Sequence, residues 1–352
     1  MTATSTTWIH SLKIETSLLV GTYTRNTDSD GIYRVVGTAE PELVARCDNP
    51  SYLIAHPQGE VVYAVIEVDD YLATKTGAVC ALFIQANGQL TEMNRQSSMG
   101  ADPCHITVSD NASYLVVSNY SGGTLTTFPL DEDGHLEDFI SLIQHTGFGV
   151  LPDRQSSAHI HSSYLVTNEQ ALLVADLGSD QLVKYQISPM GQISTEQRQT
   201  LATAPGAGPR LMALRGSHFY LLNELNNSIT LHRTSDLQIE QSCSTLPGGC
   251  TTNSIAAHIE ISRDGKFLYA SNRGHDSISV FSLEEGLTLI QNISSGGEHP
   301  RHFALTPNGT ELYVANMLSN RINCFSRDPD TGLLNDSGRY TSIPSPTCVL
   351  FL

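Results

Sequence analysis

The feature that most constrains this chain is an internal repeat of hairpins. Residues 256–272 (AAHIEISRDGKFLYASN) and 300–316 (PRHFALTPNGTELYVAN) share one scheme, in which an alternating strand, a turn and a second strand ending in Asn follow one another. The turns Asp-Gly at 264–265 and Asn-Gly at 308–309 supply residues that tolerate the positive φ angles of a tight hairpin. Such self-similarity predicts an array of equivalent structural units.

Four more copies of the hairpin follow the same scheme, at residues 50–66, 103–119, 160–176 and 209–223. After each copy we expect a third strand, then a polar turn and a weaker fourth strand. The third strands are clearest at residues 181–187, 228–234, 277–283 and 321–327. Five of the second strands end at Asn119, Asp176, Asn223, Asn272 and Asn316, with spacings of 57, 47, 49 and 44 residues. These spacings are close to the roughly 40–50 residues of a four-stranded propeller blade.

The two ends of the chain complement each other. Residues 344–352 (PSPTCVLFL) form a first strand with nothing after it, whereas residues 17–23 and 31–35 form second and third strands without a first. Pairing them completes a seventh unit and removes the exposed sheet edges of an open array. We therefore predict an all-β, seven-bladed β-propeller of four-stranded antiparallel blades, its ring closed by pairing the N- and C-terminal strands in one blade. Residues 1–352 are expected to form a single domain, with 1–16 as a short irregular extension.

Charge and cysteine content limit the partners and the compartment. The formal net charge of −17 disfavours nucleic acid and anionic membrane surfaces as partners. The seven cysteines include no CxxC pair, so neither a disulfide framework nor a zinc site is indicated, and their odd number fits a reducing compartment. The first 17 residues have no apolar signal-peptide region, and no apolar stretch approaches the roughly 20 residues of a membrane span. We expect a cytoplasmic protein that is a monomer or a weak homo-oligomer.

The blade topology indicates where functional residues gather. A first strand starts on the face where the second strand of the same blade ends, so residues at these positions encircle one mouth of the central channel. They are Glu67, Cys104, His105, His159, His161, Arg210, Glu224, His258, Arg273, Arg301, His302 and Asn316. Only 19 residues of this acidic chain are Lys or Arg. Three arginines at one mouth would therefore make the electrostatic potential locally positive, which favours an anionic small molecule as the ligand.

A structural role is the alternative for individual polar residues of the blades. Any single His or Asn in this set could instead bond the backbone of a neighbouring blade. We expect Asn119, Asn272 and Asn316 to form turns. Four further histidines, which lie away from the mouth, are expected to be surface or packing residues: His10, His145, His218 and His232.

Six motifs in order carry a resemblance to a known family. They are NYSGGTLTTFPL (119–130), RQSSAHIHS (154–162), VADLGSDQLVKY (174–185), GAGPR (206–210) with NEL (223–225), SNRGHDSISVF (271–281) and HPRHFALTPNGTELYVAN (299–316). Together they resemble the lactonase family of seven-bladed propellers, which includes bacterial 6-phosphogluconolactonases and fungal carboxymuconate cyclases. The resemblance implies hydrolysis or formation of a lactone ring without a metal or an organic cofactor.

The resemblance also implies roles for the mouth residues. The catalytic His, Arg and Glu of the cyclases match His161, Arg210 and Glu224, with either His161 or Glu224 as general base and Arg210 facing the oxyanion. The residues expected to bind substrate are Arg273, Arg301, His302, His105, His159 and Glu67, with Arg273 and Arg301 on a phosphate. Leu211 stands where the family has a His, and the turn after it is two residues shorter, which puts the distance between Arg210 and Glu224 in question.

The favoured function is therefore a sugar-lactone hydrolase, with 6-phosphogluconolactone as the expected substrate. A muconate-type lactonizing cycloisomerase or lactonase on a dicarboxylate is one alternative, because the same arginines would accept it. A non-enzymatic interaction scaffold is another, although the GH…WD pattern of many scaffolds is missing and the only Trp, Trp8, lies outside every repeat. A metal-dependent gluconolactonase would need more carboxylates than Glu67 and Glu224 provide.

Overall fold

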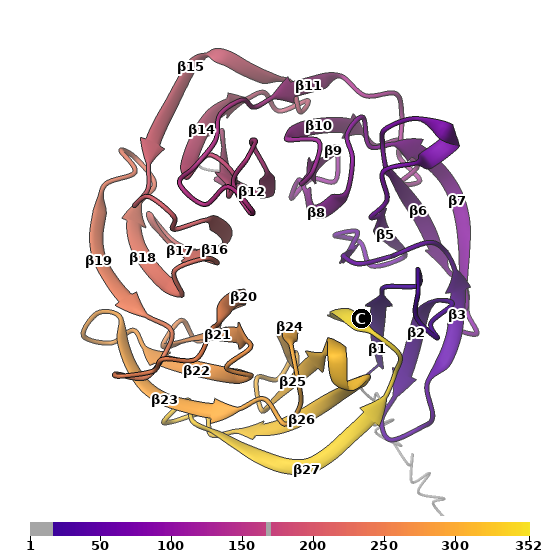
Figure 1. The fold of residues 1–352 in the computed structure, drawn as a ribbon. Helices are drawn as coiled ribbons and strands as arrows, with labels where there is room; N and C mark the ends of the chain where they lie inside the picture. Colours follow the sequence, from indigo (N-terminus) through magenta and orange to yellow (C-terminus); the bar gives the residue numbers. More distant parts are fainter. Residues whose placement is uncertain (1–16, 167–169) are drawn as a thin grey trace, which may run out of the picture.

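Seven four-stranded antiparallel sheets form a closed ring in the computed structural model, which describes residues 17–166 and 170–352 (Figure 1). The seven-bladed propeller predicted from the hairpin repeat is thus confirmed. Trp8, His10 and the expected N-terminal extension lie outside the described residues. Blade 1 consists of β4 (Leu53–Ala55), β5 (Val61–Ile66), β6 (Ala78–Ile84) and β7 (Leu90–Ser97). Blade 2 consists of β8 (Pro103–Val108), β9 (Tyr114–Asn119), β10 (Thr124–Pro129) and β11 (Ser141–Gln144). Blade 3 consists of β12 (Ile160–Val166), β13 (Ala171–Asp176), β14 (Gln181–Ile187) and β15 (Ile193–Ala202).

The remaining blades follow the same order from the axis outward. Blade 4 consists of β16 (Pro209–Arg215), β17 (His218–Asn223), β18 (Ser228–Arg233) and β19 (Ile239–Ser244). Blade 5 consists of β20 (Ile255–Ile261), β21 (Phe267–Arg273), β22 (Ser277–Ser282) and β23 (Thr288–Ser294). Blade 6 consists of β24 (Pro300–Leu305), β25 (Glu311–Asn316), β26 (Arg321–Arg327) and β27 (Leu334–Ser342). Blade 7 consists of β28 (Pro346–Phe351), β1 (Ser17–Thr22), β2 (Gly31–Val36) and β3 (Glu42–Arg46). Two short 3₁₀ helices lie in loops, η1 (Tyr71–Ala73) and η3 (Met317–Ser319).

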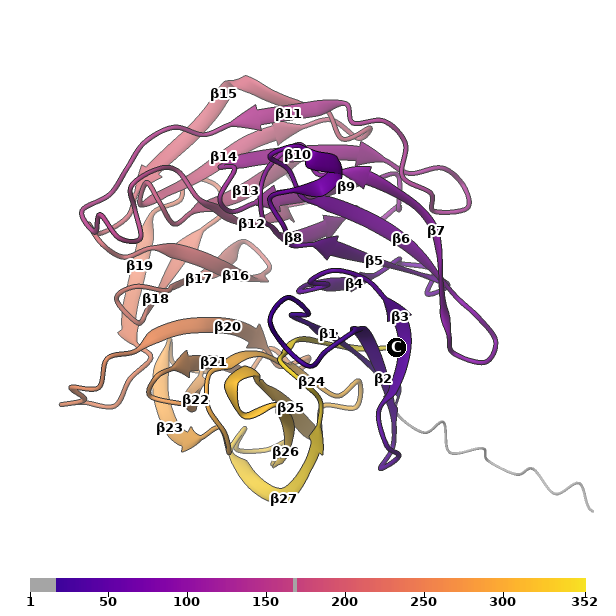
Figure 2. The same ribbon diagram turned by 45° about the vertical axis from the view of Figure 1, so that its right-hand side comes forward.

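Blade 7 closes the ring with strands from both ends of the chain. The C-terminal β28 pairs antiparallel with β1, from Leu18 opposite Phe351 to Thr22 opposite Pro346. Figures 1 and 2 show the yellow C-terminal strand beside the indigo β1. The inner strand of this blade is therefore supplied by the last residues of the chain, as the complementary ends predict.

The hairpin turns depend on glycine. Gly265 and Gly309 both adopt a φ of +70°, the left-handed region that favours glycine. The residue before each glycine acts through its side chain: Oδ1 of Asp264 accepts the Lys266 N–H at 2.9 Å, and Oδ1 of Asn308 accepts the Thr310 N–H at 3.1 Å. In each turn the glycine thus provides the positive φ angle, and the Asp or Asn before it provides a side-chain hydrogen bond.

The core lies between the blades, because each second strand is buried on both faces. In β5, Ala64 and Ile66 pack with Leu19 of blade 7, whereas the intervening Tyr63 and Val65 pack with Leu115 of blade 2. Full burial of one such aliphatic side chain contributes about 1.5–3 kcal/mol. The period-two alternation of a strand therefore links each blade to both of its neighbours.

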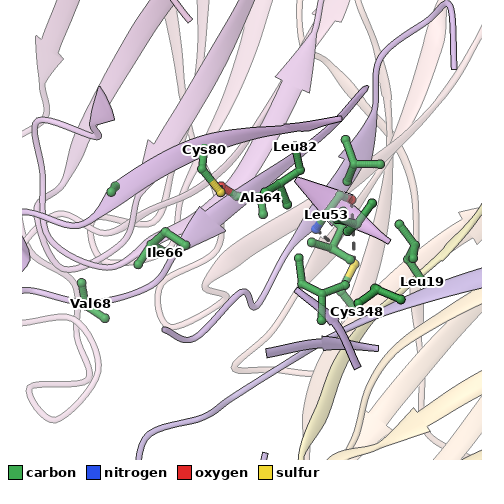
Figure 3. Packing of buried hydrophobic residues seen from close by; sticks show 13 residues of the cluster. Leu19, Leu53, Ala64, Ile66, Val68, Cys80, Leu82 and Cys348 are labelled. Atoms are coloured by element: carbon green, nitrogen blue, oxygen red, sulfur yellow. Dashed lines mark hydrogen bonds between the residues drawn. The ribbon is translucent and has the colours of Figure 1, made fainter. Parts of the chain in front are cut away.

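The closing strand takes part in the same packing. Figure 3 shows Cys348 of β28 between Leu19 and Leu53, with its Sγ 3.4 Å from the backbone nitrogen of Leu53. All seven cysteines are free thiols, and four of them, Cys80, Cys104, Cys324 and Cys348, are buried. Here they act as small apolar side chains rather than as cross-links.

The repeated Asn residues are structural, although they act mainly as bridges. Asn119 and Asn316 are fully buried, and their Nδ2 atoms donate to the carbonyls of Ser98 and Ser295, in the segments that lead into the same blades. Asn272 does the same to Thr245. These bonds tie the second strand to the segment that enters the blade. The turn role predicted for the three Asn residues is wrong, because all of them lie within strands and act through their side chains.

Two of the remaining histidines are packing residues. His145 is buried and bonds Asp176 at 2.9 Å and the Tyr185 hydroxyl at 2.8 Å, and His232 is stacked on Phe219. His218 is partly exposed beside Glu240. Among the described residues, no helix has the length and apolar character needed to cross a membrane.

Candidate active site

An irregularity at the start of the inner strands aims side chains at the mouth. In β8, β12, β16 and β24 the register shifts by one residue, which leaves Cys104, His161, Arg210 and Arg301 without a partner across the strand. A bulge of this kind turns the extra side chain away from the regular alternation. Each of these four blades therefore presents one extra residue at the mouth, and in blades 3, 4 and 6 that residue is His or Arg.

Glu224, directly after β17, is the centre of a buried cluster of charges. Its Oε1 lies 2.5 Å from Nη2 of Arg154, and its Oε2 lies 3.0 Å from Nη2 of Arg273. Nη1 of Arg210 also donates to Oε2. His161 completes the set, with Nε2 3.9 Å from Oε2. We call these five residues the Glu224 cluster.

The Glu224 cluster carries more positive than negative charge. Burial alone would raise the pKa of Glu224, but the charges of Arg273 and Arg210 more than offset it and hold this pKa well below its usual range. Burial lowers the pKa of Arg273 to about 9, which still leaves it charged at neutral pH. Three guanidinium groups thus surround one carboxylate, and the excess charge favours an anion in the space beside them.

His161 is a neutral imidazole with a defined tautomer. Its Nε2 lies 2.5 Å from Nη1 of Arg210, and because a guanidinium can only donate, Nε2 must accept and the proton must be on Nδ1. Burial and the charge of Arg210 hold the pKa of His161 well below its ordinary value. The lone pair that a general base would use is therefore present, and Arg210 occupies it in this state.

A second cluster lies across the mouth and is electrically balanced. Nη2 of Arg301 is 2.6 Å from the Tyr23 hydroxyl and 3.6 Å from Oε2 of Glu67. The Tyr23 hydroxyl donates to Oε1 of Glu67 at 2.8 Å, and the hydroxyl of Ser51 donates to Oε2. Burial raises the pKa of Tyr23, which keeps it a neutral donor. Here the charge of Arg301 is matched by Glu67.

His105 and His302 lie deeper, near the axis of the ring. The Tyr52 ring is 4.7 Å from that of His105 and 6.1 Å from that of His302, and His258 is 3.8 Å from His302. Blades 1 and 6 are not neighbours, so Tyr52 and His302 can meet only near the axis. Burial lowers the pKa of both His105 and His302 to about 3. With Tyr164, whose ring is 5.0 Å from that of His105, they form the axial cluster.

His159 lies between blades 2 and 3, outside both charged clusters. Its ring is stacked on Tyr120 at 4.5 Å, and its Nδ1 donates to the Tyr120 carbonyl at 3.0 Å. The edge of Tyr120 faces His161, with ring centroids 5.4 Å apart. Of the nine residues predicted for the site, the structure thus groups His161, Arg210, Glu224 and Arg273, and it places the others around them.

Two arginines of the Glu224 cluster, Arg154 and Arg273, line a pocket of about 560 Å³, a size typical of small-molecule sites. It is lined by Leu151, Asp153, Arg154, Leu225, Asn253, Ser254, Ile255, Arg273, Gly274 and His299. Three residues near the mouth are absent from the predicted set: Arg154, His299 and Tyr23. Arg154 lies in a loop that the repeat does not describe. His299 directly precedes β24, as His159 precedes β12, and Tyr23 directly follows β1, as Glu224 follows β17, so the repeat alignment could have found both.

Two departures from the family pattern turn out to lie away from the pocket. Leu211 is buried between blades 4 and 5, where it packs with Tyr220 and Ala256. The shortened turn, around Gly216 with a φ of +60°, is at the opposite end of the hairpin from Arg210. Arg210 and Glu224 remain in direct contact.

The described residues contain no group of three or more His, Cys, Asp or Glu side chains arranged to hold a metal ion. The fold and the site together define a seven-bladed propeller with an arginine-rich pocket at one mouth. This chain belongs to the seven-bladed β-propeller lactonase family, whose sequence profile matches residues 17–351.

Individual relatives cover nearly the whole chain. It is 33% identical to a 6-phosphogluconolactonase of Bacillus subtilis, over 95% of this chain and 97% of the relative. It is 34% identical to a 6-phosphogluconolactonase of Formosa agariphila, over 90% of this chain and 94% of the relative. The structure of a periplasmic gluconolactonase from Pseudomonas aeruginosa superposes with a TM-score of 0.88 at 28% identity, over 96% of this chain and 99% of that one.

Proposed function

We propose that this protein hydrolyses a phosphorylated sugar lactone, with 6-phospho-D-glucono-1,5-lactone as the substrate and 6-phosphogluconate as the product. The observation that carries the proposal is the excess positive charge of the Glu224 cluster beside a pocket large enough for a sugar acid. The names of the two bacterial relatives support the same substrate. The cytoplasmic location and the monomeric or weakly oligomeric state stay predictions.

Of the two candidate bases, His161 fits the role better than Glu224. Glu224 accepts from three arginines, so the lone pairs of its carboxylate are occupied. It serves to hold the arginines in place. His161 is neutral at neutral pH, and its Nε2 becomes free when Arg210 turns away.

The proposed reaction follows from this arrangement. Nε2 of His161 takes a proton from water while the water oxygen attacks the lactone carbonyl carbon. Arg210 turns to the developing oxyanion, a contribution worth about 10²–10³-fold for one such donor in other hydrolases. When the tetrahedral intermediate collapses, the bond to the ring oxygen breaks and the imidazolium returns its proton to that oxygen. The product acid then releases one proton to solvent.

The test is a direct comparison of substrates. We expect hydrolysis of 6-phosphogluconolactone well above its spontaneous rate, a lower kcat/KM for gluconolactone, and little turnover of carboxymuconate, with and without a chelator. His161→Gln should lower kcat by about 10²–10⁴-fold, the usual contribution of a general base. Preferred turnover of carboxymuconate would replace the proposal with the dicarboxylate alternative. Activity that needs an added divalent ion would replace it with metal-assisted chemistry.

A further inference from the structure

Of the four arginines at the mouth, two line the pocket. Arg301 is paired with Glu67 and Tyr23, and its guanidinium is stacked 4.9 Å over the Tyr23 ring. Arg210 uses Nε on the Ala257 carbonyl and Nη1 on His161 and Glu224. Arg154 and Arg273, in contrast, each contact Glu224 through one terminal nitrogen and also line the pocket.

Arg154 is presented by a loop that is held rigidly. The neighbouring Gln155 is fully buried, and its Nε2 donates to the Leu177 carbonyl at 2.9 Å. Its Oε1 accepts the N–H of Leu151 at 3.1 Å, and its backbone bonds both Leu151 and Gly149. The side chain of Arg154 is 37% exposed, and Nε and Nη1 have no partner among residues 17–166 and 170–352. This arrangement directs free donors into the pocket at little conformational cost.

His299 supplies a third polar group on the same wall. Its backbone is left-handed, with a φ of +62°, and is fixed by bonds from its N–H to Asp276 at 2.8 Å and from the Met317 N–H to its carbonyl at 3.1 Å. Burial, together with the charges of Arg273 and Arg301, lowers the pKa of His299 to about 4. At neutral pH it is an uncharged donor that adds no repulsion to a cationic wall.

The charges around the pocket leave a positive balance. Arg154, Arg210 and Arg273 contribute three positive charges, against one from Glu224 and one from Asp153 on the rim. A phosphate ester suits such a wall, because guanidinium groups bind its oxygens through paired hydrogen bonds.

We propose that Arg154, Arg273 and His299 form the subsite for the phosphate group of the substrate, with the lactone ring directed inward toward Arg210 and His161. This inference rests on the proposed function. It adds an orientation of the substrate, with the phosphate at the pocket wall and the lactone ring toward Arg210 and His161. It keeps Arg273 from the sequence expectation, in which Arg273 and Arg301 bind the phosphate, and replaces Arg301 with Arg154 and His299. Arg301 is already paired with Glu67 and does not line the pocket.

The test compares two substrates in matched variants. Arg154→Gln removes one guanidinium from the subsite, and His299→Asn replaces the imidazole. Arg25→Gln is the control, because Arg25 is 39% exposed on a loop of blade 7 and pairs with Asp70 and Asp48 instead of lining the pocket. For each protein, kcat and KM are measured with 6-phosphogluconolactone and with gluconolactone, which lacks the phosphate.

We expect Arg154→Gln to lower kcat/KM for the phosphorylated lactone by about 10–100-fold, mainly through KM, and for gluconolactone at least tenfold less. His299→Asn should change the same ratio in the same direction by a smaller factor. Arg25→Gln should leave the ratio as in the wild type. Equal losses for both lactones in Arg154→Gln, or a wild type indifferent to the phosphate, would overturn the subsite while leaving lactone hydrolysis in place. A wild type that hydrolyses neither lactone would instead overturn the proposed function.

Discussion

Replacing His105 with Phe tests how the axial cluster affects stability in acid. The His105 ring is 1% exposed, is packed against Tyr52 and Tyr164, and has no hydrogen-bond partner for either nitrogen among the described residues. Phe retains an aromatic ring at this position and removes a group whose pKa is lowered to about 3 by burial, with a further contribution from His302. The substitution therefore alters one titration and no hydrogen bond of the described residues.

The magnitude follows from linkage between protonation and folding. An unfolded-chain His has a pKa of about 6.5, so between pH 6.5 and 3 the unfolded state binds a proton that folded His105 does not. Stability is therefore lost as the pH falls through this window. At pH 5 the loss is about 1.5 × 1.36, or about 2 kcal/mol, because His105 is still neutral in the folded protein. This value does not depend on how far below 4 the folded pKa lies.

Other buried groups also titrate, so the comparison with wild type is essential. His161, His258 and His302 have lowered pKa values and act in the same direction as His105. Glu260 acts oppositely, because burial raises its pKa to about 8 and the folded state then holds the extra proton. All four remain in the variant, and their contributions cancel in the difference.

The assay is urea unfolding at pH 7 and pH 5. We expect the stability of His105→Phe to fall by about 2 kcal/mol less than that of the wild type between these pH values. With an m value of about 3–4 kcal/mol/M, this corresponds to a midpoint difference of about 0.5–0.7 M urea. Tyr164→Phe is the control, since it alters the same packing without removing a group that titrates in this range. Identical pH dependence in His105→Phe and wild type would refute the assignment of a buried neutral imidazole.

Three further predictions concern the charged cluster, ring closure and one close backbone contact. Glu224→Gln should lower the free energy of unfolding by about 3 kcal/mol or more and reduce turnover, because three arginines lose their only shared carboxylate; unchanged urea midpoints would contradict this role. Deleting residues 346–352 removes β28 and should abolish cooperative unfolding, as followed by circular dichroism; a truncated chain that unfolds like the full one would show that closure is dispensable. Gly178→Ala should destabilise by about 1–3 kcal/mol, because the new Cβ would lie 1.9 Å from the Ser157 carbonyl oxygen, whereas Gly248→Ala, with open space around it, should leave the urea midpoint nearly unchanged.

The hairpins were the most predictable part of the protein. The segments predicted at 256–272 and 300–316 match β20–β21 and β24–β25 to within one residue, since strand alternation and the Asp-Gly and Asn-Gly turns are local properties. The pairing of the two chain ends was also predictable, because neither end has enough strands to form a whole blade by itself.

The candidate site was predictable only where it coincides with repeated positions. His161 and Arg210 occupy equivalent positions in the inner strands of blades 3 and 4, and Glu224 directly follows the second strand of blade 4, so the repeat alignment alone brings them to one mouth. Arg154 lies in a loop that the repeat does not describe, and Gln155 determines its place through contacts made in the folded chain.

The sequence by itself determined the four-stranded blade, the number of blades, and the face of the ring where residues that differ between blades gather. These features depend only on the order of strands and turns along the chain. The tertiary structure decided the electrostatics of that face. Arg301 is neutralised by Glu67 from another blade, Arg154 and Arg273 keep free donors, and His105 is withdrawn to the axis. Such outcomes depend on distances between side chains that are remote in sequence, and these distances exist only after seven blades have closed into a ring.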